Sequence, residues 1–321
     1  MRRPTRLMHE RRAARPQDYM HYYGGAFMAR HRSRFGSRLI CKLFSSMHSI
    51  IVNYRLWLHG AASRILLLAI AVLTFFVGPA AAFEAEDMLR RNTSIDGNGT
   101  PYRVLLPDSQ QRAKPLPLIV FLNGSGQIGS DNEAQVTQNT GSLFANFLSP
   151  EHLARQPIFL VAPQSRTDRW NPDEIIEVVA KVRAEFDIDA DRIYLTGLST
   201  GGSAVWDTLK AYPDIFAAGV PISSGSAFEG LDRIVHIPLW IFHGINDHAT
   251  DRRYGDGGGR FGPRWLVTAL LDLGGHPGYT EYDDDGHNIW DRVYADERLF
   301  PWLIAQHRPH ITPAQSVKTL Q

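Results

Sequence analysis

The sequence predicts an α/β fold with a doubly wound, mostly parallel sheet for the part of the chain after residue 82. Short apolar runs alternate there with stretches of helical periodicity, which is typical of β-α-β units. Two of these runs, 116–122 and 158–162, are almost continuously apolar, as expected for strands buried on both faces. No internal repeat or low-complexity run follows residue 83, so we interpret 83–321 as one domain.

The expected strands end at turn-forming residues or lead directly into helical patterns. Pro107 ends the first strand and Pro163 the third, because proline cannot donate a hydrogen bond to a neighbouring strand. Strands are predicted at 102–106, 116–122, 158–162, 192–196, 217–222, 237–242 and 279–282.

The expected helices are marked by start signals or by apolar residues at helical spacing. Asn171 followed by Pro172 is typical of an N-cap and a first helical turn, and apolar residues then recur up to Phe186. Further helices are predicted at 200–212, 262–273 and 296–306.

The charges are divided unevenly between the two parts of the chain. Residues 1–82 hold 13 basic and 2 acidic side chains, whereas 83–321 hold 21 basic and 31 acidic ones. An acidic body is unfavourable for phosphate contacts, so we expect no nucleic-acid partner. The only cysteine, Cys41, precedes the body, which therefore forms no disulfide and has no cysteine nucleophile.

The basic segment 1–82 is interpreted as an extension followed by a signal peptide. Arg64 precedes an apolar core at 65–77, and the small residues 80–82 follow, which predicts export to the periplasm or the exterior. The core is short for a membrane span of about 20 residues, so an uncleaved anchor, the only expected membrane contact, is the alternative. Because signal peptides begin near the start of a chain, we hypothesise that translation starts at Met47.

A Gly-rich turn joins the expected strand 192–196 to the expected helix 200–212. It reads Gly197-Leu198-Ser199-Thr200-Gly201, a G-x-S-x-G pattern in which the flanking glycines let a serine occupy a tight strand-to-helix corner. Because a strand precedes the motif and an apolar helix follows it, we predict that Ser199 is a nucleophile rather than an incidental turn residue.

A serine hydroxyl needs a base to take its proton and an acid to orient that base. Asp247 follows strand 237–242 and His287 follows strand 279–282, so the chain order Ser, Asp, His is complete. Other histidines, His243, His248 and His276, lie at a strand end, beside Asp247 and in a turn, and fit the role less well. The aspartates 283–285 are an alternative source of the acid, but they are close to His287 in sequence and are by default a solvated loop.

Acyl transfer also requires N–H donors for the oxyanion. We predict the backbone N–H of Thr200, the residue after the nucleophile, and that of Ser125 in the Gly-rich loop after strand 116–122. A plain flexible loop is the alternative. No P-loop lysine or dinucleotide motif is present, and the aspartates lack calcium-loop spacing, so no cofactor and no metal are expected.

Residues 83–321 resemble the α/β-hydrolase superfamily. Within it, they are most similar to the secreted predicted-peptidase and carboxylesterase group, which is related to dienelactone hydrolases and to the prolyl oligopeptidase catalytic domain. The resemblance covers most of 101–306, and it implies the same roles for Ser199, Asp247 and His287. Two positions depart from the family, which usually has His-Gly where this chain has Asn123-Gly124 and an Arg before the Gly of Gln127-Ile128-Gly129. The matching stretches are PLIVFLNGSGQIGSDNEAQ, DRIYLTGLSTGGSAVWDTLKAYPDIFAAGVPIS, IPLWIFHGINDHAT and YTEYDDDGHNIWDRVYADERLFPWL.

Only 14 residues separate strands 217–222 and 237–242, so we expect no large cap over the site. Loops 123–150 and 251–264 are expected to form its entrance. The arginines of the second loop, Arg252, Arg253, Arg260 and Arg264, are candidates to bind an acidic group, although a solvated loop is the default interpretation. The predicted function is hydrolysis of a small-molecule or polymeric carboxylic ester. Alternatives are a serine peptidase of the prolyl oligopeptidase type and an inactive hydrolase fold used for binding.

Overall fold

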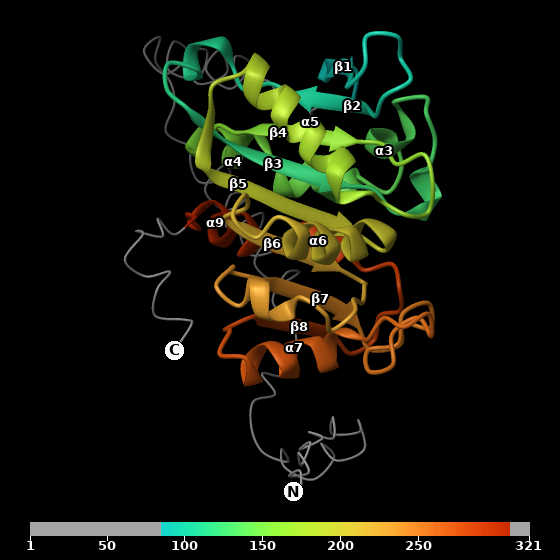
Figure 1. Cartoon of the computed structure of the whole chain (residues 1–321). Coiled ribbons are helices and arrows are strands. Elements are labelled where there is room, and N and C mark those ends of the chain that lie inside the picture. Colours follow the sequence, from blue (N-terminus) through green and yellow to red (C-terminus); the bar gives the residue numbers. More distant parts are fainter. Residues whose placement is uncertain (1–84, 309–321) are drawn as a thin grey trace, which may run out of the picture. The chain divides into compact units, whose positions relative to one another are not determined.

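A computed structural model describes residues 85–308, which contain one eight-stranded sheet (Figure 1). The strands are ordered β1-β2-β4-β3-β5-β6-β7-β8. β2 is antiparallel to both of its neighbours, and all other neighbouring strands are parallel. The predictions for 1–82, including Met47 and the apolar core 65–77, lie outside the described residues. Within residues 85–308, no helix is both long and apolar enough to cross a membrane.

The bounds of the elements follow the chain. The strands are β1 (Leu89–Asn92), β2 (Pro101–Leu105), β3 (Leu116–Leu122), β4 (Phe159–Pro163), β5 (Ile188–Leu198), β6 (Ala218–Ile222), β7 (Trp240–Gly244) and β8 (Gly278–Tyr282). The α-helices are α3 (Ala134–Thr137), α4 (Pro150–Arg155), α5 (Pro172–Glu185), α6 (Thr200–Ala211), α7 (Pro263–Asp272), α8 (Trp290–Tyr294) and α9 (Leu299–Ile304). The short turns include η4 (Ser125–Gln127) and η6 (Leu231–Ile234), which are 3-10 helices, and η5 (Leu143–Phe147), a π-helix.

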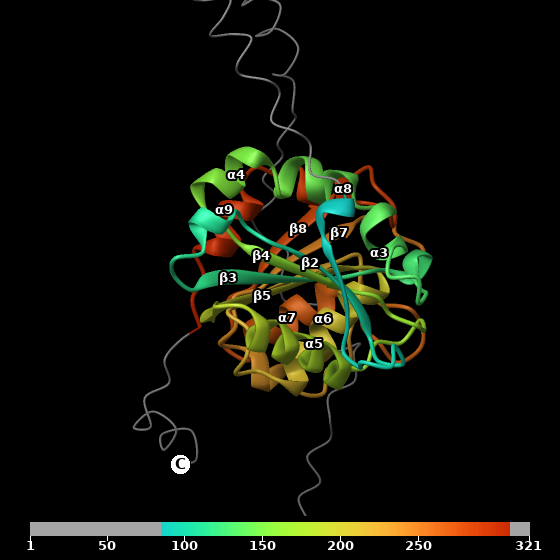
Figure 2. The ribbon, with the colours of Figure 1, turned by 90° about the horizontal axis from the view of Figure 1, so that it is seen from above.

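Helices cover both faces of the sheet, as the predicted doubly wound fold requires. Figure 2 shows α5, α6 and α7 on one side and α4, α8 and α9 on the other. The buried apolar residues form two clusters that match these layers, one with side chains of α5, α6 and α7 and one with side chains of η5, α8 and α9. The predicted fold class is confirmed.

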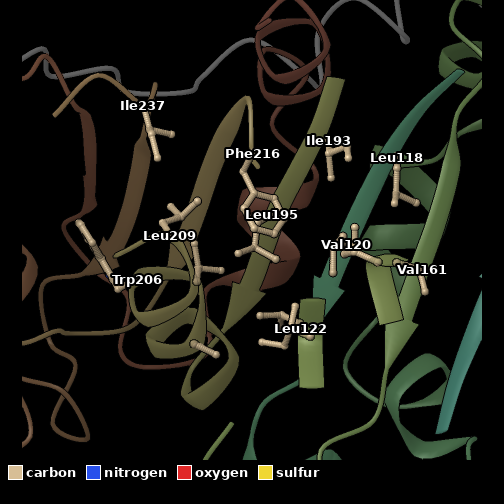
Figure 3. Packing of buried hydrophobic residues seen from close by; sticks show 14 of the residues in the cluster. Leu118, Val120, Leu122, Val161, Ile193, Leu195, Trp206, Leu209, Phe216 and Ile237 are labelled. Carbon is tan, nitrogen blue, oxygen red and sulfur yellow. The ribbon is translucent and has the colours of Figure 1, made fainter. Parts of the chain in front are cut away.

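The central strand β3 shows how the sequence pattern produces this two-sided core. Leu118, Val120 and Leu122 belong to the cluster beneath α5 and α6, and part of that cluster is drawn in Figure 3. Ile119 and Phe121 belong to the cluster on the opposite face. Because successive side chains of a strand point to opposite faces, a strand between two helical layers must be apolar at every position.

The predicted elements are present with small shifts of their ends. β3 has the predicted bounds, and the predicted N-cap Asn171 accepts a 3.0 Å hydrogen bond from the Asp173 N–H at the start of α5. β7 begins three residues later than predicted, since Pro238 has no N–H with which to continue the ladder. The connection between β6 and β7 contains only the short η6 and no inserted domain. This agrees with the prediction that no large cap covers the site.

Candidate active site

Ser199 lies at the corner between β5 and α6 in an unusual backbone conformation, with φ 55° and ψ −119°. Two neighbouring glycines make this corner possible. A Cβ on Gly197 would lie 2.5 Å from the backbone oxygen of Gly201, and a Cβ on Gly201 would lie 2.2 Å from the backbone oxygen of Leu122. The G-x-S-x-G pattern therefore reflects close backbone packing around the serine, and the strand-turn-helix context is the one that the motif requires.

Asp247 lies in the loop after β7, and its side chain is completely buried. Its Oδ1 accepts hydrogen bonds of 2.9 Å from the N–H groups of Ala249 and Thr250, and its Oδ2 faces the imidazole of His287. Burial alone would raise the pKa of this carboxyl, but the hydrogen bonds from His287 and Thr250 outweigh it and lower the pKa below its ordinary value. Asp247 is therefore a carboxylate held in a fixed orientation.

His287 connects the two other residues. Its Nδ1 lies 2.8 Å from Asp247 Oδ2, and its Nε2 lies 2.8 Å from Ser199 Oγ. The loop that carries it is fixed by Ser223, whose hydroxyl donates a 2.6 Å hydrogen bond to the His287 carbonyl oxygen. The imidazole, at 24% side-chain exposure, packs edge-on against Trp290. The structure thus brings together the three residues selected from the sequence, from loops after β5, β7 and β8.

A second histidine, His243, lies close to this group but is placed differently. It is fully buried, its Nε2 is 2.8 Å from the carbonyl oxygen of Thr250, and the same nitrogen is 3.5 Å from Asp247 Oδ2. Burial lowers the pKa of His243 below its ordinary value despite the nearby carboxylate. A neutral ring that donates to a carbonyl supports the loop around Asp247. His248 and His276 are exposed and take no part in the group.

The two N–H groups predicted for the oxyanion site come from loops that meet at Ser199. The position of a Cβ on Gly124, next to Ser125, would be 3.4 Å from the Ser199 Cβ. Within residues 85–308, neither the Ser125 N–H nor the Thr200 N–H donates to a protein acceptor. Both groups are therefore free to bind an oxygen atom of a ligand.

The charged loops around the site make internal pairs. Arg260 pairs with Asp207, Arg264 with Glu281, and Arg252 donates to the Ile245 carbonyl oxygen. These three arginines stabilise the protein's own loops, which weakens the expectation that they bind an acidic substrate group. In the described part of the chain, no group of three or more His, Cys, Asp or Glu side chains is arranged to hold a metal ion.

The sequence did not reveal the roles of two buried amide side chains in the oxyanion loop (residues 123–127), named for the Ser125 N–H predicted to bind the oxyanion. Asn123 and Gln127 are fully buried, and both make hydrogen bonds to the backbone of Gly124. The available signal was their departure from the resembling family at these positions. Their other hydrogen-bond partners, Ser165 for Asn123 and Gln138 for Gln127, lie 42 and 11 positions away, too far to be seen in a local pattern.

Comparison with known proteins agrees with the fold. The prolyl oligopeptidase family matches residues 159–252, a stretch that holds Ser199 and Asp247. A thermostable esterase of known structure is 32% identical, with a TM-score of 0.61 over 70% of this chain and 64% of the esterase. The feruloyl esterase module from Clostridium thermocellum, solved with sinapinate, shares the fold at 15% identity, with a TM-score of 0.53 over 70% of this chain and 90% of the module.

A curated relative, the bifunctional acetylxylan esterase/xylanase of Neocallimastix patriciarum, is 25% identical over 83 residues. This match covers 26% of the chain and 12% of the relative, so the chain spans only a small part of that protein. The eight-stranded sheet, the nucleophile turn and these similarities agree with one another. The chain therefore has the α/β-hydrolase fold, and the proteins that it resembles are esterases and peptidases.

Proposed function

We propose that the protein is a serine hydrolase that cleaves carboxylic esters through an acyl-enzyme on Ser199. The observation that carries the proposal is the placement of His287, with Nε2 and Nδ1 each 2.8 Å from Ser199 and Asp247 respectively. A carboxylate can only accept a hydrogen bond, so Nδ1 carries the proton and Nε2 is left to accept the serine proton.

In the first half of the reaction, Ser199 Oγ attacks the ester carbonyl carbon while its proton moves to His287 Nε2. Asp247 stabilises the resulting imidazolium, and the N–H groups of Thr200 and Ser125 stabilise the negative oxygen. His287 then protonates the leaving alcohol, and the acyl group remains on Ser199. In the second half, a water gives its proton to His287 and attacks the acyl carbon; His287 then gives this proton to Ser199 Oγ as the acyl–oxygen bond breaks, which releases the acid and restores both residues.

Esters are preferred over amides in this proposal because two relatives with detectable sequence similarity are described as esterases. The short connection between β6 and β7 favours a polar or polymeric ester over a long acyl chain that needs a covered pocket. The match to the prolyl oligopeptidase family supports a peptidase as the second candidate. Comparing turnover of a short aryl acetate with that of a peptide amide separates the two.

The mechanism is tested with Ser199→Ala. We expect kcat/KM for the aryl acetate to fall by at least about 10⁴-fold, because the nucleophile is lost, and labelling by a fluorophosphonate probe to disappear. An unchanged thermal melt would show that the fold is kept. Labelling that persists in the variant would mean that another residue is the nucleophile, and a wild-type protein that takes no label would favour the inactive, binding alternative.

A further inference from the structure

Two buried amide side chains hold the backbone on either side of Gly124. Asn123 Nδ2 donates a 2.8 Å hydrogen bond to the Gly124 carbonyl oxygen, and Gln127 Oε1 accepts a 3.0 Å hydrogen bond from the Gly124 N–H. Both side chains are fully buried. The two peptide groups that flank this glycine are therefore fixed by side chains and not only by the fold of the loop.

The hydrogen bonds from Asn123 and Gln127 to Gly124 determine which backbone N–H group of the loop can bind a ligand oxygen. In a trans peptide the C=O and N–H point in opposite directions, so fixing the Gly124 carbonyl also fixes the N–H of Ser125. The Gly124 N–H is occupied by Gln127 and is not available to a ligand, whereas the Ser125 N–H makes no hydrogen bond within the described residues. Gly124 itself packs against Leu198 and Ser199, so this donor is held beside the nucleophile.

The two amides are themselves anchored to distant parts of the chain. Asn123 Oδ1 accepts a 3.1 Å hydrogen bond from the N–H of Ser165, just after β4, and Gln127 Nε2 donates to the carbonyl oxygen of Gln138. Trp170 donates its indole N–H to the Asn123 carbonyl oxygen at 3.2 Å. The oxyanion loop is thus tied to the segment between β4 and α5 and to the one after α3.

We propose that Asn123 and Gln127 are positioning residues that set the Ser125 N–H for the oxyanion. The inference rests on the proposed serine hydrolase function. It applies to this chain in particular, because Asn123 stands where the resembling family has His and Gln127 lies in the segment where that family has Arg. Neither side chain touches the reacting atoms, and each acts through the Gly124 peptide groups.

The test compares two buried glutamines given the same substitution. Gln127→Met removes the acceptor of the Gly124 N–H. Gln135→Met removes an equally buried amide whose Nε2 donates to Asn132 and Ala162 and which has no hydrogen bond to Gly124. Both substitutions are neutral, so neither adds a charge near the oxyanion, and both are expected to lower Tm. Only Gln127→Met is expected to affect catalysis.

For Gln127→Met we expect kcat for an aryl acetate to fall about 10- to 100-fold with KM changed less than about threefold, because the donor matters most in the transition state. The affinity for a trifluoromethyl ketone, which Ser199 converts to a tetrahedral adduct, should fall by the same factor. For Gln135→Met, kcat should stay within about threefold of wild type. Asn123→Ala is a second variant with the same expectation as Gln127→Met.

The outcomes separate this inference from the function on which it rests. Ester turnover that survives Ser199→Ala would overturn the proposed function itself. The positioning role alone would be overturned if turnover depends on Ser199 but kcat and the affinity for the ketone are unchanged in both Gln127→Met and Asn123→Ala. The positioning role would also be overturned if kcat falls equally in Gln127→Met and Gln135→Met and in proportion to the loss of Tm. A general loss of packing would then explain the effect.

Discussion

Ser199 occupies a backbone conformation that a residue with a side chain rarely adopts. Such conformations cost free energy and persist where the surroundings hold them, frequently at active sites. Here the Ser199 N–H donates a 3.0 Å hydrogen bond to Ile222, and its carbonyl accepts one of 3.0 Å from Ser203. The backbone on both sides of the serine is therefore engaged, and its Oγ is left to face His287.

Asp247→Asn is expected to lower kcat by about 10⁴-fold, while the fold is kept and Tm falls by about a few degrees, because the stability linked to the low pKa of the carboxylate is lost. The asparagine oxygen can still accept the N–H groups of Ala249 and Thr250, so the loop is kept. The neutral amide cannot stabilise an imidazolium, and it can donate to Nδ1 and so favour the wrong tautomer of His287. Steady-state kinetics with an aryl acetate and a thermal melt measure the two effects.

Asp251→Asn is the matched control for this variant. Asp251 lies in the same loop, and its Oδ1 accepts hydrogen bonds from the N–H groups of Arg253 and Tyr254 in the same way, but it does not contact His287. We expect its kcat to remain close to wild type. Similar losses in both variants would assign the effect to the loop and not to the pairing of carboxylate and imidazole.

At the scale of elements, the start of α6 is packed directly against the end of β3 through Gly201. A Cβ at this position would lie 2.2 Å from the Leu122 carbonyl oxygen and 2.6 Å from that of Asn123, and both contacts are with backbone. Gly201→Ala is therefore expected to lower the free energy of unfolding by about 1–3 kcal/mol, as overpacking does. Because the helix must shift, kcat should fall as well. Urea unfolding and ester kinetics measure both.

Gly141→Ala is the control for the same substitution in open space. A Cβ there would have no atom within 4 Å, and Gly141 does not have a positive φ. Its free energy of unfolding is expected to stay the same or to rise by up to about 1 kcal/mol, because alanine restricts the unfolded chain. A Gly201→Ala protein as stable as Gly141→Ala would contradict the close packing of α6 on β3.

The elements found from the sequence are those whose own residues carry the signal. β3 is apolar throughout, and the N-cap Asn171 with Pro172 marks the start of α5. β1, with the sequence LRRN, was missed because its burial is only partial and its side chains are polar. The short helices α3, α4 and α8, of four to six residues, were missed as well. Helices of this length are stabilised by packing on the rest of the protein and carry too few residues to show a period.

At the scale of the whole molecule, many carboxyl groups have a pKa below the ordinary value in the folded protein. Each is more acidic when folded than when unfolded, so it contributes stability above its unfolded pKa that is lost as pH falls through its folded pKa. We expect the free energy of unfolding to decline slightly below about pH 6.5, where the unfolded chain protonates His243, and to fall more steeply below about pH 5. These carboxyl groups are Asp96, Asp131, Asp189, Asp247, Asp251, Glu281 and Asp296.

Glu281→Gln tests this expectation at one of these groups. Burial alone would raise the pKa of Glu281, but hydrogen bonds from Arg264 and Tyr279 lower it. The variant should lose about 1–2 kcal/mol at pH 7 and show a weaker decline between pH 5 and 3 in urea titrations. Glu151→Gln, in an exposed pair with Arg155, is the control and should change by less than about 0.5 kcal/mol. Equal effects of the two variants would contradict a special role for the Arg264–Glu281 pair.

The fold class and the two-sided burial of the central strands follow from the sequence alone, which also selects Ser199, Asp247 and His287 as the candidate site. These depend on local patterns, such as period, turn residues and the position of a residue after a strand, that can be recognised along the chain. Only the tertiary structure decided how the loops after β3, β5, β7 and β8 meet, which arginines are already paired, and how Asn123 and Gln127 hold Gly124. Hydrogen bonds such as that from the Ser165 N–H to Asn123 join residues 42 positions apart, and their formation depends on the parallel strands placing those loops at one edge of the sheet.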